Sequence, residues 1–273
     1  MLVGGMPESV KSWVEHHDYV RCQEVQDDIV VTYEDDFPKY KKNVDPVLLR
    51  QTLRSAAVQA TKKFVYSKVG SDYKTAEVKK AVELLVLAGI LYPVTRTDAN
   101  GLPFGSEEDR SYQKMLLLDT GLLLRLLNLS LGDVSELTTQ ILTASAAELT
   151  NKGPLAEMLV GLEMLRYMSP NIRHDLFYWV RLAKNSQAEV DYVSNYLQTV
   201  IPIEVKADRQ GGMKSLWSFM REKKLHFAIR CSMENFGKFE YIDKEDNSEI
   251  RHVSICPIYA IAQMPQIKQS AAE

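Results

Sequence analysis

The chain has 273 residues, a formal net charge of −3 and 45% hydrophobic residues, values typical of a globular protein with about two domains. This slightly acidic balance argues against a protein that is basic all over, so any contact with nucleic acid must come from a local basic patch. The three cysteines, Cys22, Cys231 and Cys256, are far apart and fit neither a disulfide framework nor a zinc ribbon, which favours a reducing cytoplasm. No apolar run in the sequence approaches the ~20 residues of a membrane span, so we expect no membrane contact.

The sequence contains neither Gly-x-x-x-x-Gly-Lys-Ser/Thr nor Gly-x-Gly-x-x-Gly, the two glycine-rich motifs that cradle nucleotide phosphates. Its N-terminus lacks the charged and apolar regions of a signal peptide. We therefore predict that this chain by itself neither binds nor hydrolyses ATP, and that it is cytoplasmic.

Residues 1–45 are predicted to form a helical segment. Pro7 stands near the first position of a short helix. A second, longer helix is expected from Val20 to about Pro38, because apolar residues recur there at helical spacing.

Residues 46–128 are predicted to form a small domain. Two helices are expected, from about Val47 to Ala57 and from Thr75 to Ala88. Two strands, from Ile90 to Thr95 and from Tyr112 to Leu118, flank a loop that contains glycine and proline. Two helices followed by a two-stranded ribbon is the order of a winged helix, a relative of the helix-turn-helix.

The stretch from 61 to 80 is strongly basic, with six lysines against two acidic residues and a net charge of +4. Such a surface can contact the phosphates of DNA. Lysines on the outer face of a helix are also commonly only solubilising, and a winged helix can contact protein instead. DNA contact is therefore a hypothesis for six residues: Lys62, Lys63, Lys68, Lys74, Lys79 and Lys80.

Residues 129–153 are predicted to be a connector, and residues 154–273 a second globular domain. The helix from Pro154 to Met168 is apolar on nearly every side, so Glu157 is expected to be partly buried and to need a partner. A metal ion, Lys206 or the N–H groups of the first helical turn would each provide one. The elements then follow in the order α-β-β-β-α-β, which predicts a mixed α/β fold with helices on the faces of a mixed sheet.

The stretch from Ile201 to Ala207 alternates apolar and polar residues and is predicted to be a strand whose polar face carries Glu204 and Lys206. A second predicted strand upstream carries Asp191, and Ser194 to Val200 has the length and polarity of a hairpin turn. An aspartate facing Glu-x-Lys on the next strand is a compact way to hold a divalent cation beside an ammonium group. The alternative is a solvated strand face with a weak ion pair.

The C-terminal half resembles the restriction-endonuclease-like, or PD-(D/E)xK, superfamily in the order of its elements: a helix with Glu157, a strand with Asp191, a strand with Glu204 and Lys206, then a helix and a strand. Six stretches of the chain are also similar to a family of bacterial and archaeal AAA-type ATPases whose C-terminal half is a domain of unknown function. They are Gly4–Glu8, Lys62–Lys68, Leu118–Leu123, Lys152–Glu157, Ala188–Asp191 and Ile201–Lys206. In that family a P-loop ATPase module precedes a winged helix and a nuclease-like domain. That module is missing from this chain, so the resemblance implies that ATP would bind only through it.

The resemblance implies a restriction-endonuclease-like sheet and a nuclease that depends on Mg²⁺ or Mn²⁺, with the winged helix positioning DNA. Asp191 and Glu204 would bind the metal, and Glu157 would complete the acidic cluster. Lys206 would orient the attacking water or neutralise charge, so these four residues would form the catalytic set. The alternative is a non-catalytic module that grips DNA or a partner protein for the ATPase. The substrate, the cellular process and the oligomeric state, with a homo-oligomer as one alternative, stay open.

Overall fold

The computed structural model describes residues 1–127, 152–167, 171, 174–182, 188–196, 198–207 and 212–263. The predicted connector at 129–153 therefore lies almost entirely outside the described residues. The chain divides into two compact units. One contains Met1–Pro93 and the segment that begins at Lys114, and the other contains Val94–Gln113 and the segment that begins at Asn151.

The first unit is built from helices, as its sequence predicts. The helices and short 3-10 turns are α1 (Pro7–His16), α2 (Tyr19–Asp36), η1 (Phe37–Tyr40), α3 (Pro46–Val58), η2 (Tyr66–Lys68), α4 (Thr75–Leu87) and α5 (Thr120–Leu126). Aspartates begin three of them: the side chains of Asp18, Asp45 and Asp119 accept hydrogen bonds from backbone N–H groups in the first turns of α2, α3 and α5. In the part of the chain that is described, no helix is long and apolar enough to cross a membrane.

The elements expected of a winged helix occur in the expected order, but the ribbon has a second role. Lys63, between α3 and η2, forms an antiparallel bridge with Lys114. After α4 come β1 (Leu91–Thr97), η3 (Phe104–Glu107) and β2 (Glu108–Leu117). Both strands are longer than predicted, and Val94 of β1 pairs in parallel with Leu176 of β3. The ribbon is therefore not a separate wing, because it continues into the large sheet.

The sheet has eight strands in the order β2-β1-β3-β4-β5-β6-β8-β7 in the part of the chain that is described. The remaining elements are α7 (Lys152–Arg166), β3 (Leu176–Val180), β4 (Glu189–Tyr196), β5 (Thr199–Lys206), α8 (Lys214–Lys223), β6 (Phe227–Ser232), β7 (Gly237–Asp243), β8 (Glu249–Pro257) and η4 (Ile258–Gln263). Parallel and antiparallel pairs both occur, which confirms the predicted mixed α/β class.

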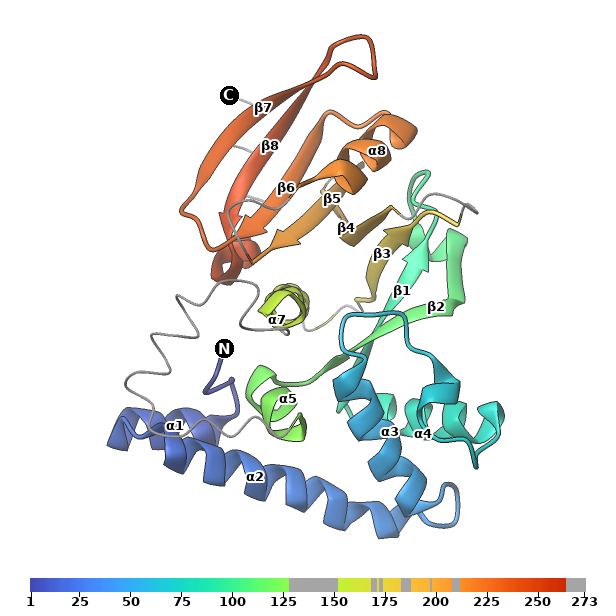
Figure 1. Cartoon of the computed structure of the whole chain (residues 1–273), viewed down its shortest axis with the longest axis vertical. Helices are drawn as coiled ribbons and strands as arrows, with labels where there is room; N and C mark the ends of the chain where they lie inside the picture. The colour runs from blue at the N-terminus through green and yellow to red at the C-terminus, as the bar shows by residue number, and fades with distance from the viewer. Residues whose placement is uncertain are drawn as a thin grey trace. The chain divides into compact units, whose positions relative to one another are not determined.

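Helix α8 covers one face of this sheet (Figure 1). Its buried residues Leu216, Phe219 and Met220 join Val190 of β4 and Ala228 of β6 in one hydrophobic core. Helix α7 packs against β5 and η4. Strand β5 thus contacts both α7, which precedes it in the sequence, and α8, which follows it.

A buried aspartate ties the N-terminal segment to α5. The N–H of Gly5 donates to Asp119 Oδ2 at 2.6 Å, and the N–H groups of Gly121 and Leu122 donate to Asp119 Oδ1 at 2.8 and 3.0 Å. Two of the stretches singled out in the sequence, Gly4–Glu8 and Leu118–Leu123, therefore meet at one carboxylate. Gly4 has a φ of 70°, and a Cβ atom there would overlap the Asp119 carboxylate.

We predict that Gly4→Ala lowers the free energy of unfolding of the helical unit by about 1–3 kcal/mol, because it adds both backbone strain and a steric clash at a buried acceptor. Urea denaturation would measure the change. Gly89→Ala is the matched control in the same unit, since Gly89 also has a φ of 70° but the nearest atom to a Cβ atom there, the Tyr92 hydroxyl, is 3.8 Å away. An equal effect of the two substitutions would contradict a specific role for the Gly4–Asp119 contact.

Candidate functional site

Strand β5 is buried along nearly its whole length, including its glutamate. Every residue from Val200 to Val205 is buried, and Glu204 is only 3% exposed. The Oε1 atom of Glu204 lies 2.5 Å from Nζ of Lys206, whose side chain is 26% exposed. The alternative of a solvated Glu-x-Lys face is therefore wrong, since a carboxylate is rarely buried unless its charge is compensated.

The pairing of β4 with β5 brings Asp191 to the same place. Tyr192 pairs with Ile203, so Asp191 and Glu204 stand one residue further along the two antiparallel strands. Asp191 Oδ2 accepts a hydrogen bond from the N–H of Val205 at 2.7 Å. The aspartate carboxylate thus contacts the backbone between the two charged residues of β5.

Helix α7 is connected to this strand pair by Tyr192. The Tyr192 hydroxyl donates to the backbone oxygen of Glu157 at 2.8 Å, and the Tyr192 side chain is fully buried. Burial raises the pKa of Tyr192, and the nearby carboxylates of Glu157 and Asp191 raise it further. The tyrosine therefore stays a neutral donor that holds the start of α7 against β4.

The charge of Lys206 responds to all three carboxylates. Burial lowers the pKa of Lys206, but the carboxylates of Glu204, Asp191 and Glu157 outweigh burial, so its pKa lies above the ordinary value. The structure thus brings together all four residues that the sequence singled out, from one helix and two strands.

The sequence reasoning missed two residues on the neighbouring strand β6. Arg230 pairs with Glu204 and Ser232 pairs with Lys206 in the parallel ladder. Both are buried, Arg230 at 9% and Ser232 at 1% exposure, and Arg230 Nη2 lies 4.0 Å from Glu234 Oε2. The sequence did contain a signal for Arg230, because a buried arginine inside an otherwise apolar strand, here the one that begins at Phe227, needs a compensating partner.

Two of the acidic residues are placed to bind a hard divalent cation. Among the described residues no three His, Cys, Asp or Glu side chains are grouped to hold a metal ion. Asp191 and Glu204 remain as a pair of carboxylates on adjacent strands. Mg²⁺ is commonly bound by one or two carboxylates together with waters and substrate phosphates, so this pair suits it. Glu157, which the sequence predicted as a third ligand, acts on Lys206 through its charge.

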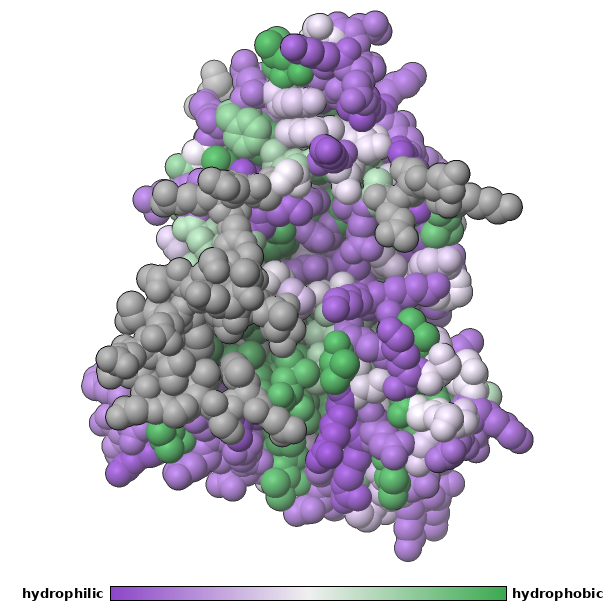
Figure 2. All heavy atoms as spheres, in the orientation of Figure 1, coloured by the Kyte–Doolittle hydropathy of each residue, from purple (hydrophilic) through white to green (hydrophobic). Residues whose placement is uncertain are grey.

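The six lysines of the basic stretch are exposed and lie between the end of α3 and the middle of α4. Figure 2 shows both hydrophilic and hydrophobic residues over α3 and α4 on the face that it draws. Lys79 Nζ lies 5.6 Å from the centre of the Tyr66 ring, a cation–π contact within the first unit. These lysines are accessible to a phosphate backbone, as DNA contact requires.

Two family models match the chain. A domain of unknown function, DUF8612, matches residues 1–133, and a second domain of unknown function, DUF4143, matches residues 152–258. No curated protein and no solved structure matches it. The exposed lysines lie in the first matched region, and Glu157, Asp191, Glu204 and Lys206 all lie in the second. Neither description states an activity.

We predict that Glu204→Gln lowers the pKa of Lys206, because the substitution removes the strongest influence that opposes burial. The raised pKa also means that the pair stabilises the fold below the ordinary lysine pKa and that this stabilisation is lost as the pH rises through the raised value. NMR titration of the lysine ammonium groups in the presence of a chelator would measure the shift. Glu189→Gln is the control, because it replaces an exposed carboxylate on the same sheet with an amide. Equal shifts of the Lys206 pKa in the two variants would contradict a specific influence of Glu204.

Proposed function

We propose that the chain is a metal-dependent DNA nuclease-like module. Phosphodiester hydrolysis would take place at the cluster of Glu157, Asp191, Glu204 and Lys206, and the exposed lysines of the first, helical unit would contact DNA. The observation that carries the proposal is the buried Glu204, compensated by Lys206 and placed opposite Asp191 on the neighbouring strand, one pair beyond Tyr192 and Ile203. Burial of a charged cluster costs stability, so its presence favours a functional role over a structural one.

Each residue has a role that its position supports. Asp191 and Glu204 would hold Mg²⁺ or Mn²⁺, which when bound supplies an activated water and offsets phosphate charge. Lys206 keeps its proton because of the surrounding carboxylates, so it presents a permanent positive charge to a phosphate or a water. Glu157 adds negative charge and is kept in place by the hydrogen bond from Tyr192 to its backbone.

The wider resemblance belongs to the same proposal. The helix-strand-strand-helix-strand order around Glu157, Asp191, Glu204 and Lys206 is similar to that of PD-(D/E)xK nucleases, and the six matching stretches are similar to the C-terminal region of AAA-type ATPases. In that setting the ATPase module would supply nucleotide-driven motion, and this chain would supply the contact with DNA. The cytoplasm is the expected compartment.

We predict that Mn²⁺ binds to the wild-type chain and that Asp191→Asn abolishes binding without unfolding the protein, because the substitution removes one of two carboxylate ligands. Isothermal titration with Mn²⁺ and circular dichroism would measure the two effects. Cleavage of DNA in Mg²⁺ should fall about 100-fold or more in Lys206→Ala, which loses charge stabilisation of the transition state.

Two controls make this prediction specific. Glu189→Gln changes an exposed carboxylate near Asp191 on β4 and should retain both metal binding and cleavage. A chelator should stop cleavage by the wild-type chain. Metal binding by Asp191→Asn equal to that of the wild type would contradict the metal site, and cleavage that persists in chelator would contradict a metal-dependent reaction.

We predict that replacing Lys74, Lys79 and Lys80 with glutamate weakens the binding of duplex DNA of any sequence. For every phosphate that the variant no longer neutralises, the slope of log affinity against log salt should fall by about 0.9. Fluorescence anisotropy over a salt series would measure the slope. The control replaces Lys11, Lys41 and Lys42, which are exposed in the same unit, and so makes the same charge change. Equal weakening by both triple variants would leave only a general charge effect and contradict a defined DNA surface.

A non-catalytic binding module is the second candidate, and one observation favours it. Glu204 Oε1 contacts Lys206 and Asp191 Oδ2 accepts from the N–H of Val205, so each carboxylate has a partner within the protein, although Glu204 Oε2 is buried without a hydrogen bond among the described residues. A cluster compensated in this way can stabilise a rigid platform for a partner protein or DNA without any reaction. Retained DNA binding together with absent cleavage and absent metal binding would favour this candidate.

A further inference from the structure

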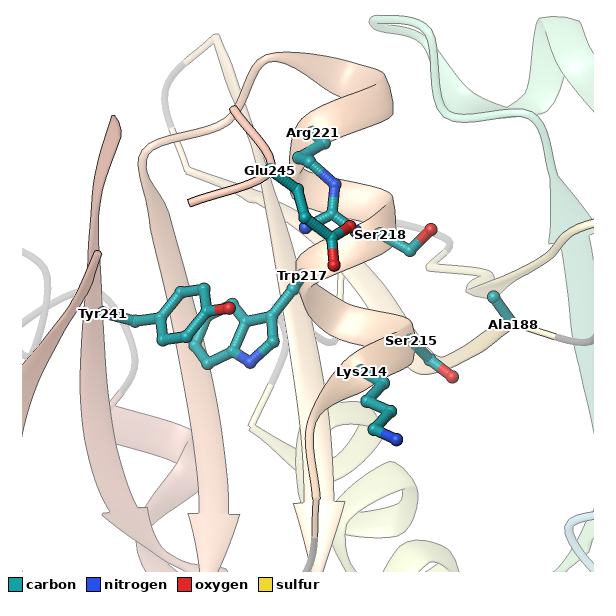
Figure 3. A pocket seen from close by; sticks show the side chains of 8 residues that line it. All are labelled: Ala188, Lys214, Ser215, Trp217, Ser218, Arg221, Tyr241 and Glu245. Atoms are coloured by element: carbon teal, nitrogen blue, oxygen red, sulfur yellow. Dashed lines mark ion pairs between the residues drawn. The ribbon is translucent and has the colours of Figure 1, made fainter. Parts of the chain in front are cut away.

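A pocket of about 460 Å³ lies beside α8 in the second unit and is lined by residues of α8, by Ala188 before β4, and by Tyr241 of β7 and Glu245 after β7 (Figure 3). None of Glu157, Asp191, Glu204 and Lys206 lines it. Its volume falls within the range of sites for small ligands, which is about 300–1,000 Å³. The pocket and the candidate metal site thus have no residue in common.

Two aromatic rings form one wall of the pocket. The rings of Trp217 and Tyr241 are stacked, with centroids 4.2 Å apart and an angle of 8° between their planes. Figure 3 shows the pair with Arg221 and Glu245 on one side and Lys214 on the other. A flat, parallel pair of rings provides a surface on which a further planar group can stack.

The two cations that line the pocket, Arg221 and Lys214, differ in whether they are available to a ligand. Arg221 Nη1 donates to both carboxylate oxygens of the buried Asp243 at 2.9 and 3.1 Å, and Arg221 Nη2 lies 2.8 Å from Glu245 Oε2. Lys214 is exposed and forms no ion pair or hydrogen bond with any residue that the structure describes. The positive charge available to a ligand is therefore that of Lys214, while Arg221 keeps the pocket wall in place.

Two serine hydroxyl groups are also available to a ligand in the pocket. Ser215 and Ser218 line the pocket from α8 and are partly exposed. Like Lys214, they make no side-chain hydrogen bond within the described part of the chain. An ammonium group and two hydroxyls beside a stacked aromatic pair suit a ligand with a planar ring and an anionic group.

We propose that this pocket binds one nucleotide of a single-stranded nucleic acid, with the base on the Trp217–Tyr241 pair and a backbone phosphate at Lys214. Stacking on aromatic side chains together with a nearby cation is how proteins hold unpaired strands without sequence preference. The choice of a strand over another planar anion rests on the proposed nuclease function. A duplex would bind more weakly at the pocket, because its bases are already stacked and paired.

The position of the pocket on the sheet fits such a role. Ala188 lines the pocket and Asp191 follows it by three residues, so their Cα atoms are at most about 10 Å apart along the chain. A nucleotide held beside Ala188 would therefore be close to the carboxylates on β4 and β5. The pocket would then select an unpaired strand for the carboxylate site.

Binding of a fluorescein-labelled oligothymidylate of ten nucleotides, measured by fluorescence anisotropy, tests the proposal. The measurement is made in chelator, so that the oligonucleotide is not cleaved. Tyr241→Ala should weaken binding about tenfold, since it removes one stacking partner. Lys214→Gln should lower the slope of log affinity against log salt by about 0.7, the value for one phosphate contact on a single strand. Tyr241→Leu, which keeps an apolar side chain against Trp217, covers the case in which the alanine variant fails to fold.

Matched controls are available for both changes. Tyr259→Ala removes a tyrosine that is 71% exposed on η4, and Lys224→Gln removes an exposed lysine at the other end of α8. Both control variants should bind the oligonucleotide as the wild type does. Wild-type binding by Lys214→Gln and Tyr241→Leu would overturn the proposal, as would equal affinity for thymidine monophosphate and the oligonucleotide, which indicates a free-nucleotide site.

The same measurements separate this proposal from the proposed function. Because binding is measured in chelator, loss of cleavage in Asp191→Asn with unchanged oligonucleotide affinity supports both. Pocket variants that bind normally while the wild type cleaves DNA would overturn only the pocket. Oligonucleotide binding that depends on Tyr241 in a protein that never cleaves would support the pocket and contradict the nuclease.

Discussion

The burial of the Glu204 carboxylate is the constraint on which the arrangement of the second unit depends. A charge 3% exposed inside a sheet costs several kcal/mol unless other charges and hydrogen-bond donors compensate it. Lys206 supplies compensation from the same strand at 2.5 Å, and Arg230 stands beside Glu204 on the parallel strand β6. The register between β5 and β6 is therefore tied to charge, because a slip of one residue would move Arg230 to the face of the sheet opposite Glu204.

The same constraint explains why α7 must stay close to the strands. Glu157 contributes to the field at Lys206, so its distance from β5 affects the balance of charge. The buried Tyr192 fixes that distance by donating to the Glu157 backbone rather than to its carboxylate. The glutamate side chain is thus oriented by the helix, and the helix is held by a neutral hydrogen bond that changes of pH near neutrality do not break.

Local patterns in the sequence predicted the elements but not their partners. The helix predicted from Thr75 to Ala88 is observed from Thr75 to Leu87, because the spacing of apolar residues is a local feature. The turn expected from Ser194 to Val200 is much shorter, since β4 continues to Tyr196 and β5 begins at Thr199. Pairing within a sheet overrides the turn preference of polar residues there. The parallel pairing of β1 with β3 joins residues about 80 positions apart, and no local pattern encodes it.

The charges around Lys206 also decide which ligands the site can accept. Glu157, Asp191 and Glu204 carry three formal negative charges against one positive charge on Lys206, while Arg230 and Glu234 beside them add one charge of each sign and leave the sum unchanged. The cluster therefore repels a phosphodiester until about two positive charges are added, which is what one divalent cation supplies. Without a metal, the same cluster favours a basic protein surface over DNA. The catalytic and non-catalytic candidates thus differ physically in a single bound ion.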